Sequence, residues 1–331
     1  MTASRKYLVI GGGAVGSIFG WRMQEGGADV SVVCRSNYAA VKANGYNITS
    51  IKFGNHTFTP NQVYRSAQEA VSNGCIYDFI LVCTKSLPNI EEPTIVVSPS
   101  ITDKKTTIVL LQNGIGIETY FAKAFPENPI LSCSVYIDVI QLAQGTIDHG
   151  STSKLEYGLY ETSASDKVRD QQALKEFESD ILAGDIDSKI ADNIQRTRWT
   201  KIVWNASFNP ISVVSGGNNS RELLRNPLTN QLLRLTMTEV LVLGEAITGE
   251  RVASCSNDEY ITNTFDFTDN RPNPVTPSML VDYINKRPME HQVILKNPID
   301  LAKKHNISVP ILETIYTFLI TLEEKNLAPV S

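Results

Sequence analysis

Three glycines near the amino end have the spacing of a phosphate-binding turn. Gly11, Gly13 and Gly16 directly follow the apolar residues 6–10 and precede a helix-like stretch. In such a turn the first glycine bends the chain, the second lets the backbone approach a pyrophosphate, and the third packs helix on strand. The helix amino end adds free N–H groups and positive dipole. The predicted ligand is a dinucleotide, and a plain strand-to-helix turn is the alternative. The predicted contact residues are Gly11, Gly12, Gly13, Ala14, Val15 and Gly16.

Arg35 occupies the position that selects the cofactor. It follows the second predicted strand, residues 28–34. Enzymes that use NAD place an acidic residue here to bind the adenosine ribose, whereas a 2′-phosphate requires a cation. The planar guanidinium can bind that phosphate through paired hydrogen bonds. The residue type therefore predicts NADPH, and a solvated loop arginine is the alternative.

Lys85 and Asn113 follow two further apolar strands, predicted over residues 77–83 and 107–111. Ligands of open α/β sheets lie outside the carboxyl ends of the strands, so both residues fall on the binding edge. Each alone is typical of a loop, since a lysine there is often solvated and an Asn-Gly pair often only turns the chain. Their shared location favours a binding role.

Lys201, Asn205 and Asn209 are spaced four apart in a segment with helical periodicity that begins at residue 193. They therefore project from nearly one helix face. One amine and two amides among Trp, Ile, Val and Phe are costly to bury without partners. The row predicts a polar cleft wall, and a solvated stripe on an amphipathic helix is the alternative.

Ser278 and Glu290 carry weaker signals. Thr276 and Pro277 predict a helix start, with Thr276 as the cap and Ser278 in the first turn. Pro288 and Pro298 are expected to break or kink the chain, and Glu290 lies just beyond the first of them. Taken alone, these patterns favour a helix-start residue and a solvated charge. His291 is interpreted as a surface or packing residue.

The elements that position these residues are predicted to form two domains, because a chain of 331 residues is longer than the chains that usually fold around one hydrophobic core. Residues 1–191 predict a Rossmann-type α/β dinucleotide-binding domain with further strands at 130–137, 154–160 and 185–190. Residues 192–331 predict a mostly α-helical substrate domain. It contains a long helix over 228–248 and a loop or short elements over 255–273. The active site is expected between the domains.

Composition bounds the functional classes. A net charge of −5 argues against a nucleic-acid surface. No apolar run approaches the ~20 residues that cross a bilayer, and the early first strand leaves no signal peptide, which predicts a cytoplasmic enzyme. Five scattered cysteines indicate reduced thiols, and the four histidines show no metal-ligand spacing. The apolar helical half would suit a homodimer.

In this order along nearly the whole chain, the motifs resemble the ketopantoate reductase (2-dehydropantoate 2-reductase) family. The matching positions are the glycine turn, Arg35, Lys85, Asn113-Gly114-Ile115-Gly116, residues 199–210 with Lys201, Asn219, Ser278-Met279, Glu290 and residues 307–310.

The resemblance implies roles for these residues. Gly11 to Gly16, Arg35, Lys85, Asn113 and Glu290 would hold NADPH. Lys201 would act as proton donor, with Glu290 as the second catalytic residue. The substrate contacts would be Asn113, Lys201, Asn205, Asn209, Asn219 and Ser278. The implied reaction, a step of pantothenate biosynthesis, reduces ketopantoate to (R)-pantoate. An ammonium beside the carbonyl can stabilise the oxygen's growing charge and supply the proton.

Two departures from the family pattern leave the substrate open. Tyr136-Ile137-Asp138 stands where members often carry small residues, and Lys296 ends a segment that usually includes glycine. A D-2-hydroxyacid dehydrogenase acting on branched or aromatic 2-oxo acids is therefore the nearest rival. A non-catalytic NADPH-binding regulator and a structural Rossmann-fold interaction protein are disfavoured, because neither would need Lys201, Asn205 and Ser278.

Overall fold

The computed structural model describes residues 4–328, and the chain divides into two compact units. The sheet unit contains residues up to 85, 91–113 and 117–194, and the helical unit contains 86–90, 114–116 and the residues from 195 onward. Two short loops that follow strands of the sheet unit thus belong to the helical unit. They directly follow Lys85 and Asn113 in the chain.

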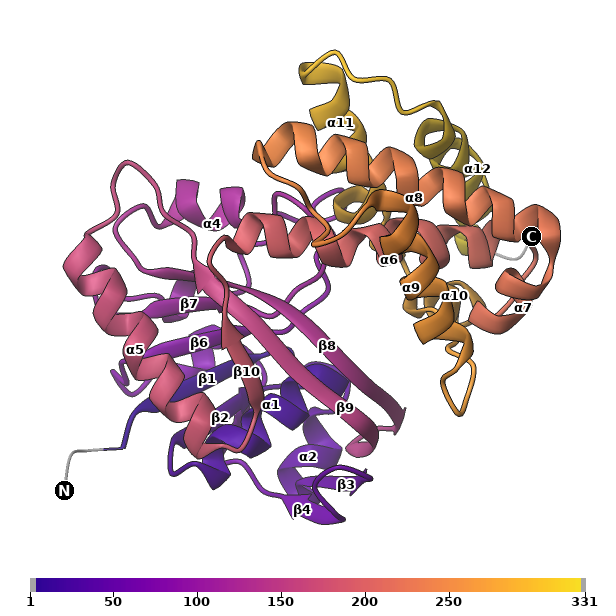
Figure 1. The fold of residues 1–331 in the computed structure, drawn as a ribbon. Helices are drawn as coiled ribbons and strands as arrows, with labels where there is room; N and C mark the ends of the chain where they lie inside the picture. The colour runs from indigo at the N-terminus through magenta and orange to yellow at the C-terminus, as the bar shows by residue number, and fades with distance from the viewer. Residues whose placement is uncertain (1–3, 329–331) are drawn as a thin grey trace. The chain divides into compact units, whose positions relative to one another are not determined.

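The sheet unit is built on one mixed sheet of ten strands (Figure 1). The strands are β1 (Lys6–Ile10), β2 (Asp29–Val33), β3 (Tyr46–Ser50), β4 (His56–Phe58), β5 (Gln62–Tyr64), β6 (Phe79–Val82), β7 (Thr107–Leu110), β8 (Ile130–Ala143), β9 (Thr146–Leu159) and β10 (Asp187–Ile190). Their order is β4-β3-β9-β8-β7-β6-β1-β2-β5, and β10 pairs with β9.

Six of these strands have the order of a dinucleotide-binding sheet. Along β5-β2-β1-β6-β7-β8 every neighbouring pair is parallel. Counted in chain order without β3 and β4, this is the 3-2-1-4-5-6 arrangement. The order reverses between β1 and β6, and ligands of such sheets bind at that switch point. The predicted Rossmann-type fold is confirmed.

Helices cover the sheet because alternate strand residues point to opposite faces. Those of the sheet unit are α1 (Ala14–Glu25), α2 (Tyr38–Asn44), α3 (Ala67–Ala70), α4 (Glu118–Ala124) and α5 (Lys167–Ala183), with the 3₁₀ turn η1 (Ser98–Ser100). Tyr7 and Phe79 stack at 4.8 Å between ring centroids, and Phe177 of α5 lies 5.9 Å from Phe79. Leu8 and Ile80 alternate with them and are equally buried, as expected for a sheet covered on both faces.

The helical unit consists of α6 (Ile194–Val214), α7 (Ser220–Arg225), α8 (Pro227–Thr248), α9 (Asn257–Asp269), α10 (Ser278–Ile284), the π-helical segment η2 (Gln292–Lys296), α11 (Asn297–Lys304) and α12 (Pro310–Leu327). In α8, a Cβ added to Gly244 would lie 2.9 Å from the Trp199 ring of α6, so glycine permits this close packing. Glu239 of α8 accepts the N–H groups of Ile311 and Leu312 at 3.0 Å and so caps α12.

Three local predictions are wrong. Residues 257–269 form the 13-residue helix α9, whose amino end is capped by Ser256, where the sequence predicts a loop or short elements. The helix predicted to start at a Thr276 cap begins instead at Ser278, because Pro277 keeps extended backbone angles. Pro298 does not interrupt the helical segment, since η2 continues directly into α11. The wider turn of a π-helix accommodates the missing N–H and the ring of a proline.

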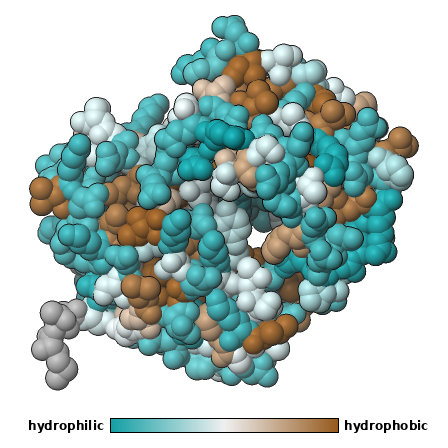
Figure 2. All heavy atoms as spheres, viewed as in Figure 1, coloured by the Kyte–Doolittle hydropathy of each residue, from teal (hydrophilic) through white to brown (hydrophobic). Residues whose placement is uncertain are grey.

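No helix among residues 4–328 is long and apolar enough to cross a membrane. On the face drawn in Figure 2, apolar side chains lie in small groups among hydrophilic ones.

Candidate active site

The three predicted glycines differ in whether the protein's own atoms leave room for a side chain. Gly11 has φ +103°, and an added Cβ would lie 2.7 Å from the Thr84 nitrogen at the end of β6. A Cβ on Gly16 would lie 2.3 Å from the Gly11 oxygen, whereas one on Gly13 would meet nothing within 4 Å. Gly11 and Gly16 are therefore required by the protein's own packing, and Gly13 faces open space.

The amino end of α1 lies at the open space beside Gly13 and has no side-chain cap. Gly13 is its N-cap residue, no side chain accepts its first N–H groups, and its first turn carries no acidic residue. Tyr46 donates to the Gly12 carbonyl at 2.9 Å, and Asn37 donates to the same oxygen. These bonds fix the turn from behind. An uncapped helix end in front of a fixed glycine turn suits a phosphate.

Arg35 lies beyond the end of β2. Its side chain is 68% exposed and pairs with Glu91 at 3.8 Å. A long, exposed pair of this kind contributes little stability, so the guanidinium can exchange it for a phosphate.

The ends of β6 and β7 are tied together by Gln112, which precedes Asn113. Its Nε2 donates to the Thr84 carbonyl at 2.8 Å. Lys85 is exposed and Asn113 is half-buried. The sheet unit therefore brings the glycine turn, Lys85 and Asn113 to the edge at which its strand order reverses.

In the helical unit, three elements hold the loop Gly114–Gly116. Arg198 of α6 donates to the Gly114 carbonyl through Nε at 3.0 Å and Nη2 at 2.6 Å. Ile115 donates its N–H to Val293 of η2 at 2.8 Å and accepts from Asn297 of α11 at 2.7 Å. The main-chain N–H and carbonyl of Ile115, the central residue of the loop that follows Asn113, are thus both held by hydrogen bonds.

Gly114 has no room for a side chain. Its φ is +103°, and an added Cβ would lie 2.4 Å from the Val293 Cβ. Together with the bonds to Ile115, this contact makes the loop and η2 fit each other closely. Single π-turns inside helices often occur at functional sites.

Glu290 is buried, with 7% of its surface exposed. Its Oε1 accepts the Ser86 N–H at 2.9 Å, which ties it to the loop that follows Lys85. The interpretation of Glu290 as a solvated charge is wrong, because the structure gives its carboxylate a main-chain partner inside the helical unit.

A histidine–glutamate contact supports the segment that carries Glu290. His291 Nε2 lies 3.0 Å from Glu323 of α12, and Met289 donates its N–H to Glu323 at 2.7 Å. Burial raises the pKa of Glu323, but the hydrogen bonds from His291 and Met289 outweigh it and lower the pKa below its ordinary value. His291 is 5% exposed, so it is a packing residue and not a surface residue.

The row on α6 is not a solvated stripe. Lys201 is half-buried, Asn205 is 9% exposed and Asn209 is 1% exposed. Among the described residues, the Asn209 Oδ1 is buried without a hydrogen-bond partner. Buried polar atoms normally have partners, and an orphaned one is typical of a site that awaits a ligand or water.

Asn219 and Ser278 have positions that limit what each can bind. Asn219 caps α7, and its Oδ1 accepts the N–H groups of Arg221 and Glu222 at 3.0 Å. Its amide nitrogen is the atom left to donate to a ligand. Ser278 is exposed at the first position of α10.

Sequence reasoning missed the residues that position others. Arg198, Gln112, Asn297 and Glu323 bond to partners that lie far away in the sequence, and none belongs to a recognised motif. Arg198 gives no clear signal in the sequence, because it lies among the mostly polar and charged residues 195–201 of α6. Among the described residues no group of three His, Cys, Asp or Glu side chains could hold a metal ion.

Comparisons with known proteins agree with this geometry. Two family models match the chain, Ketopantoate reductase PanE/ApbA over residues 7–162 and its C-terminal counterpart over 193–323. A 2-dehydropantoate 2-reductase of Nostoc sp. is 27% identical, across 97% of this chain and 96% of its own. The crystal structure of 2-dehydropantoate 2-reductase from Methylococcus capsulatus is 34% identical, with a TM-score of 0.82 and coverage of 98% and 99%. A ternary structure of D-mandelate dehydrogenase with NADH and anilino(oxo)acetate shares the fold, at TM-score 0.85 and 19% identity over 98% of this chain and all of that one.

Fold, strand order and relatives together define an NAD(P)-dependent oxidoreductase. Its two units correspond to the two parts that the family models match. The chain belongs to the ketopantoate reductase family.

Proposed function

We propose that this protein reduces a 2-oxo acid to a (R)-2-hydroxy acid with NADPH, and that ketopantoate is the leading substrate. The observation that carries the proposal is the buried face of α6. It combines the amine of Lys201 with two amides, and the Asn209 Oδ1 has no partner within the described part of the chain. The family relationship supplies the substrate class.

The sheet unit fits the cofactor. The open space at Gly13 and the uncapped end of α1 suit the pyrophosphate, and the exposed Arg35 suits a 2′-phosphate. When bound, NADPH supplies the hydride that adds to the carbonyl carbon. Lys85, Asn113 and Glu290 are proposed as its remaining contacts.

Lys201 is the proposed proton donor. Negative charge grows on the carbonyl oxygen during reduction, and an ammonium can stabilise that charge and deliver the proton. Asn205 and Asn209 orient the 2-oxo acid from the same helix, and Ser278 and the Asn219 amide bind its polar groups. Glu290 is proposed as the second catalytic residue, because the Ser86 N–H fixes its buried carboxylate within the helical unit.

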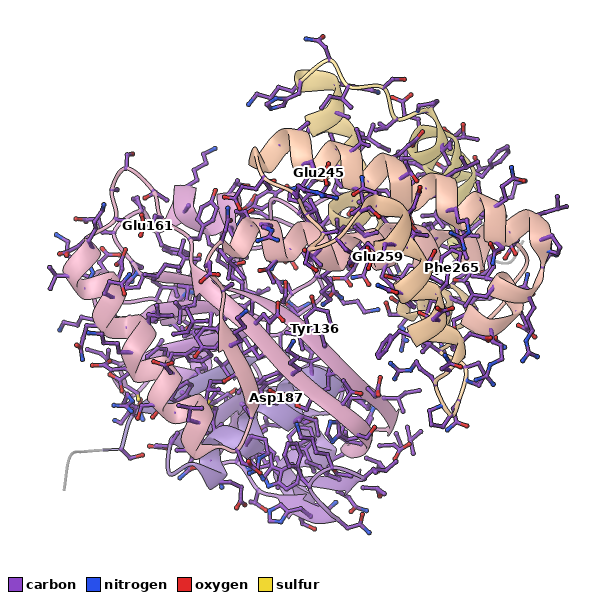
Figure 3. The ribbon with its side chains drawn as sticks, in the orientation of Figure 1. Tyr136, Glu161, Asp187, Glu245, Glu259 and Phe265 are labelled. Atoms are coloured by element: carbon purple, nitrogen blue, oxygen red, sulfur yellow. The ribbon has the colours of Figure 1, made fainter. Side chains whose placement is uncertain are left out.

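Bulkier branched or aromatic 2-oxo acids are the second candidate substrates. Tyr136 lies on β8 (Figure 3), where Lys154 of β9 is 5.8 Å from its ring. The pairing register of β8 shifts between Ile137 and Val139, so Asp138 lies in a bulge. Bulges often re-aim side chains beside active sites. Lys296, the other departure, pairs with Asp300 at 2.5 Å.

The test is NADPH oxidation assayed with ketopantoate and a series of bulkier 2-oxo acids, for the wild type and Lys201→Met. We expect Lys201→Met to lower kcat by roughly 10²- to 10⁴-fold, with the NADPH dissociation constant nearly unchanged. Lys201→Arg keeps the charge as the matched control. Unchanged turnover in Lys201→Met would contradict its role, and a wild type without turnover on any 2-oxo acid would favour a regulator. Faster turnover of a bulky acid than of ketopantoate would select the second candidate.

A further inference from the structure

We propose that Arg65 is a second ligand of the cofactor's 2′-phosphate, held ready by Tyr38 beside Arg35. This inference rests on the proposed use of NADPH. It concerns a residue that neither the glycine motif nor the strand-ending Arg35 identifies.

The sheet brings the two arginines to the same edge. Strands β2 and β5 are parallel neighbours, with Val33 opposite Tyr64. Cys34, the residue after β2, donates its N–H to the carbonyl of Tyr64, the last residue of β5, at 2.9 Å. The pairing therefore continues to the ends of both strands. Arg35 and Arg65 then leave adjacent strands at their carboxyl ends. That edge is the binding edge of a parallel sheet.

Tyr38 connects the two arginines. Its N–H bonds to the Arg35 carbonyl at 3.3 Å, and the Arg65 guanidinium carbon lies 4.1 Å from its ring centroid. Lys42 donates to the Tyr38 hydroxyl at 2.7 Å and fixes the ring from the next turn of α2. A guanidinium over an aromatic face is held by its flat side, and its N–H donors, which lie in the plane, remain able to bind a ligand.

The local charge is unbalanced in favour of an anion. Among residues 4–328 no carboxylate pairs with the Arg65 side chain, and Glu69 accepts only the main-chain N–H of Arg65, at 2.7 Å. Arg65, Arg35 and Lys42 are all exposed. With Glu91 paired to Arg35 at 3.8 Å, these three cations outnumber the two nearby carboxylates, Glu69 and Glu91. A phosphate monoester carries a charge near −2 at neutral pH, which two guanidinium groups can match through several hydrogen bonds.

The experiment compares binding of adenosine 2′-monophosphate and adenosine 5′-monophosphate by calorimetry. The variants are Arg65→Met, Arg35→Met and, as the matched control, Arg225→Met, which removes an exposed arginine of α7. Methionine keeps the packing on Tyr38 and removes the charge. We expect Arg65→Met to weaken binding of the 2′-phosphate about tenfold or more, and to leave the 5′-phosphate and the melting temperature nearly unchanged. Arg65→Lys should restore part of the loss.

The outcomes separate this inference from the proposed function. If the wild type binds the 2′-phosphate better and only Arg35→Met loses that preference, the role of Arg65 is wrong and NADPH stands. If the wild type shows no preference for the 2′-phosphate, and uses NADH and NADPH equally, the NADPH proposal and this inference both fail. Equal losses in Arg65→Met and Arg225→Met would show a general charge effect and would also overturn the inference.

Discussion

The sheet unit and the helical unit prepare their binding groups in opposite ways. In the sheet unit the proposed site is largely main chain, since Gly11, Gly13 and Gly16 shape a turn and α1 presents N–H groups. In the helical unit the proposed site is made of side chains on α6 and of Glu290, whose carboxylate is held by a segment distant in sequence. The first kind of site depends on the absence of side chains, and the second depends on a network that holds them.

This difference changes what a substitution does. A glycine of the turn in the sheet unit is needed either because a side chain would clash with the protein or because it would occupy the place of the ligand. The distances from an added Cβ distinguish these two cases. In the helical unit a residue such as Arg198, which is not itself a predicted ligand contact, bonds to the peptide that follows Asn113. We therefore expect positioning residues to matter more in the helical unit.

Among the positioning residues, the largest effect is expected from Arg198→Met. It leaves the buried Gly114 carbonyl without its two donors, which costs about 1–3 kcal/mol and loosens the loop after Asn113. We expect kcat/KM for the 2-oxo acid to fall roughly 10- to 100-fold at a temperature where the variant remains folded. Steady-state kinetics measure this effect.

Arg196→Met is the matched control, because Arg196 lies on the same helix and donates to the Arg251 carbonyl at 2.7 Å. Its kcat/KM should stay near that of the wild type. Equal losses in the two variants would mean that α6 tolerates no arginine replacement and that the clamp on Gly114 has no special role.

The second prediction contrasts two glycines of one turn. In Gly16→Ala the new Cβ meets the Gly11 oxygen, so the unfolding free energy should fall by about 1–3 kcal/mol. In Gly13→Ala the methyl group meets only open space, so stability should hold while NADPH binding weakens roughly tenfold, because the methyl group occupies the pyrophosphate's place. Urea unfolding and cofactor titration measure the two effects. A Gly13→Ala variant that binds NADPH normally would place the pyrophosphate elsewhere.

The same contrast explains how far the sequence could lead. The spacing of the three glycines predicts the turn, because Gly16 meets Gly11 within one strand-turn-helix unit. The contact of Gly11 with Thr84 at the end of another strand is not visible in that spacing. The clamp on Gly114 and the bond from Ser86 to Glu290 span 84 and 204 residues. No local pattern encodes such distances, and only the folded chain reveals them.

Two local errors have physical causes of their own. In α9 the buried residues Ile261, Phe265 and Thr268 do follow helical spacing, but polar neighbours mask the period. At Pro298 the rule that proline ends a helix fails, because the π-turn of η2 opens the chain just before it. Both cases show packing overriding a local preference.

The smallest expected effect is a pH dependence confined to the sheet unit. His149 is fully buried, its Nδ1 lies 2.8 Å from the Ser50 hydroxyl, and its Nε2 lies 3.2 Å from the Thr152 carbonyl. The carbonyl can only accept, so Nε2 carries the proton and Nδ1 accepts from Ser50. Burial, the largest cause, lowers the pKa of His149 below its ordinary 6.5, and the nearby Lys52 acts in the same direction. The Thr152 carbonyl, Asp138 and Asp148 oppose it.

Because the folded pKa is depressed, the unfolded chain binds a proton first as the pH falls. The stability that neutral His149 provides is complete above about pH 6.5 and decreases below it, by up to about 1.4 kcal/mol per pH unit. Trp21 can report the change, since Phe53 packs edge-on against it and stacks on His149. His149→Gln should flatten the dependence, whereas replacing the exposed His305 of the helical unit should not. An unchanged slope between about pH 4.5 and 6.5 in His149→Gln would contradict this prediction. The lowered pKa of Glu323 places its loss of stability only below the ordinary value of 4.5, so that pair cannot produce the slope.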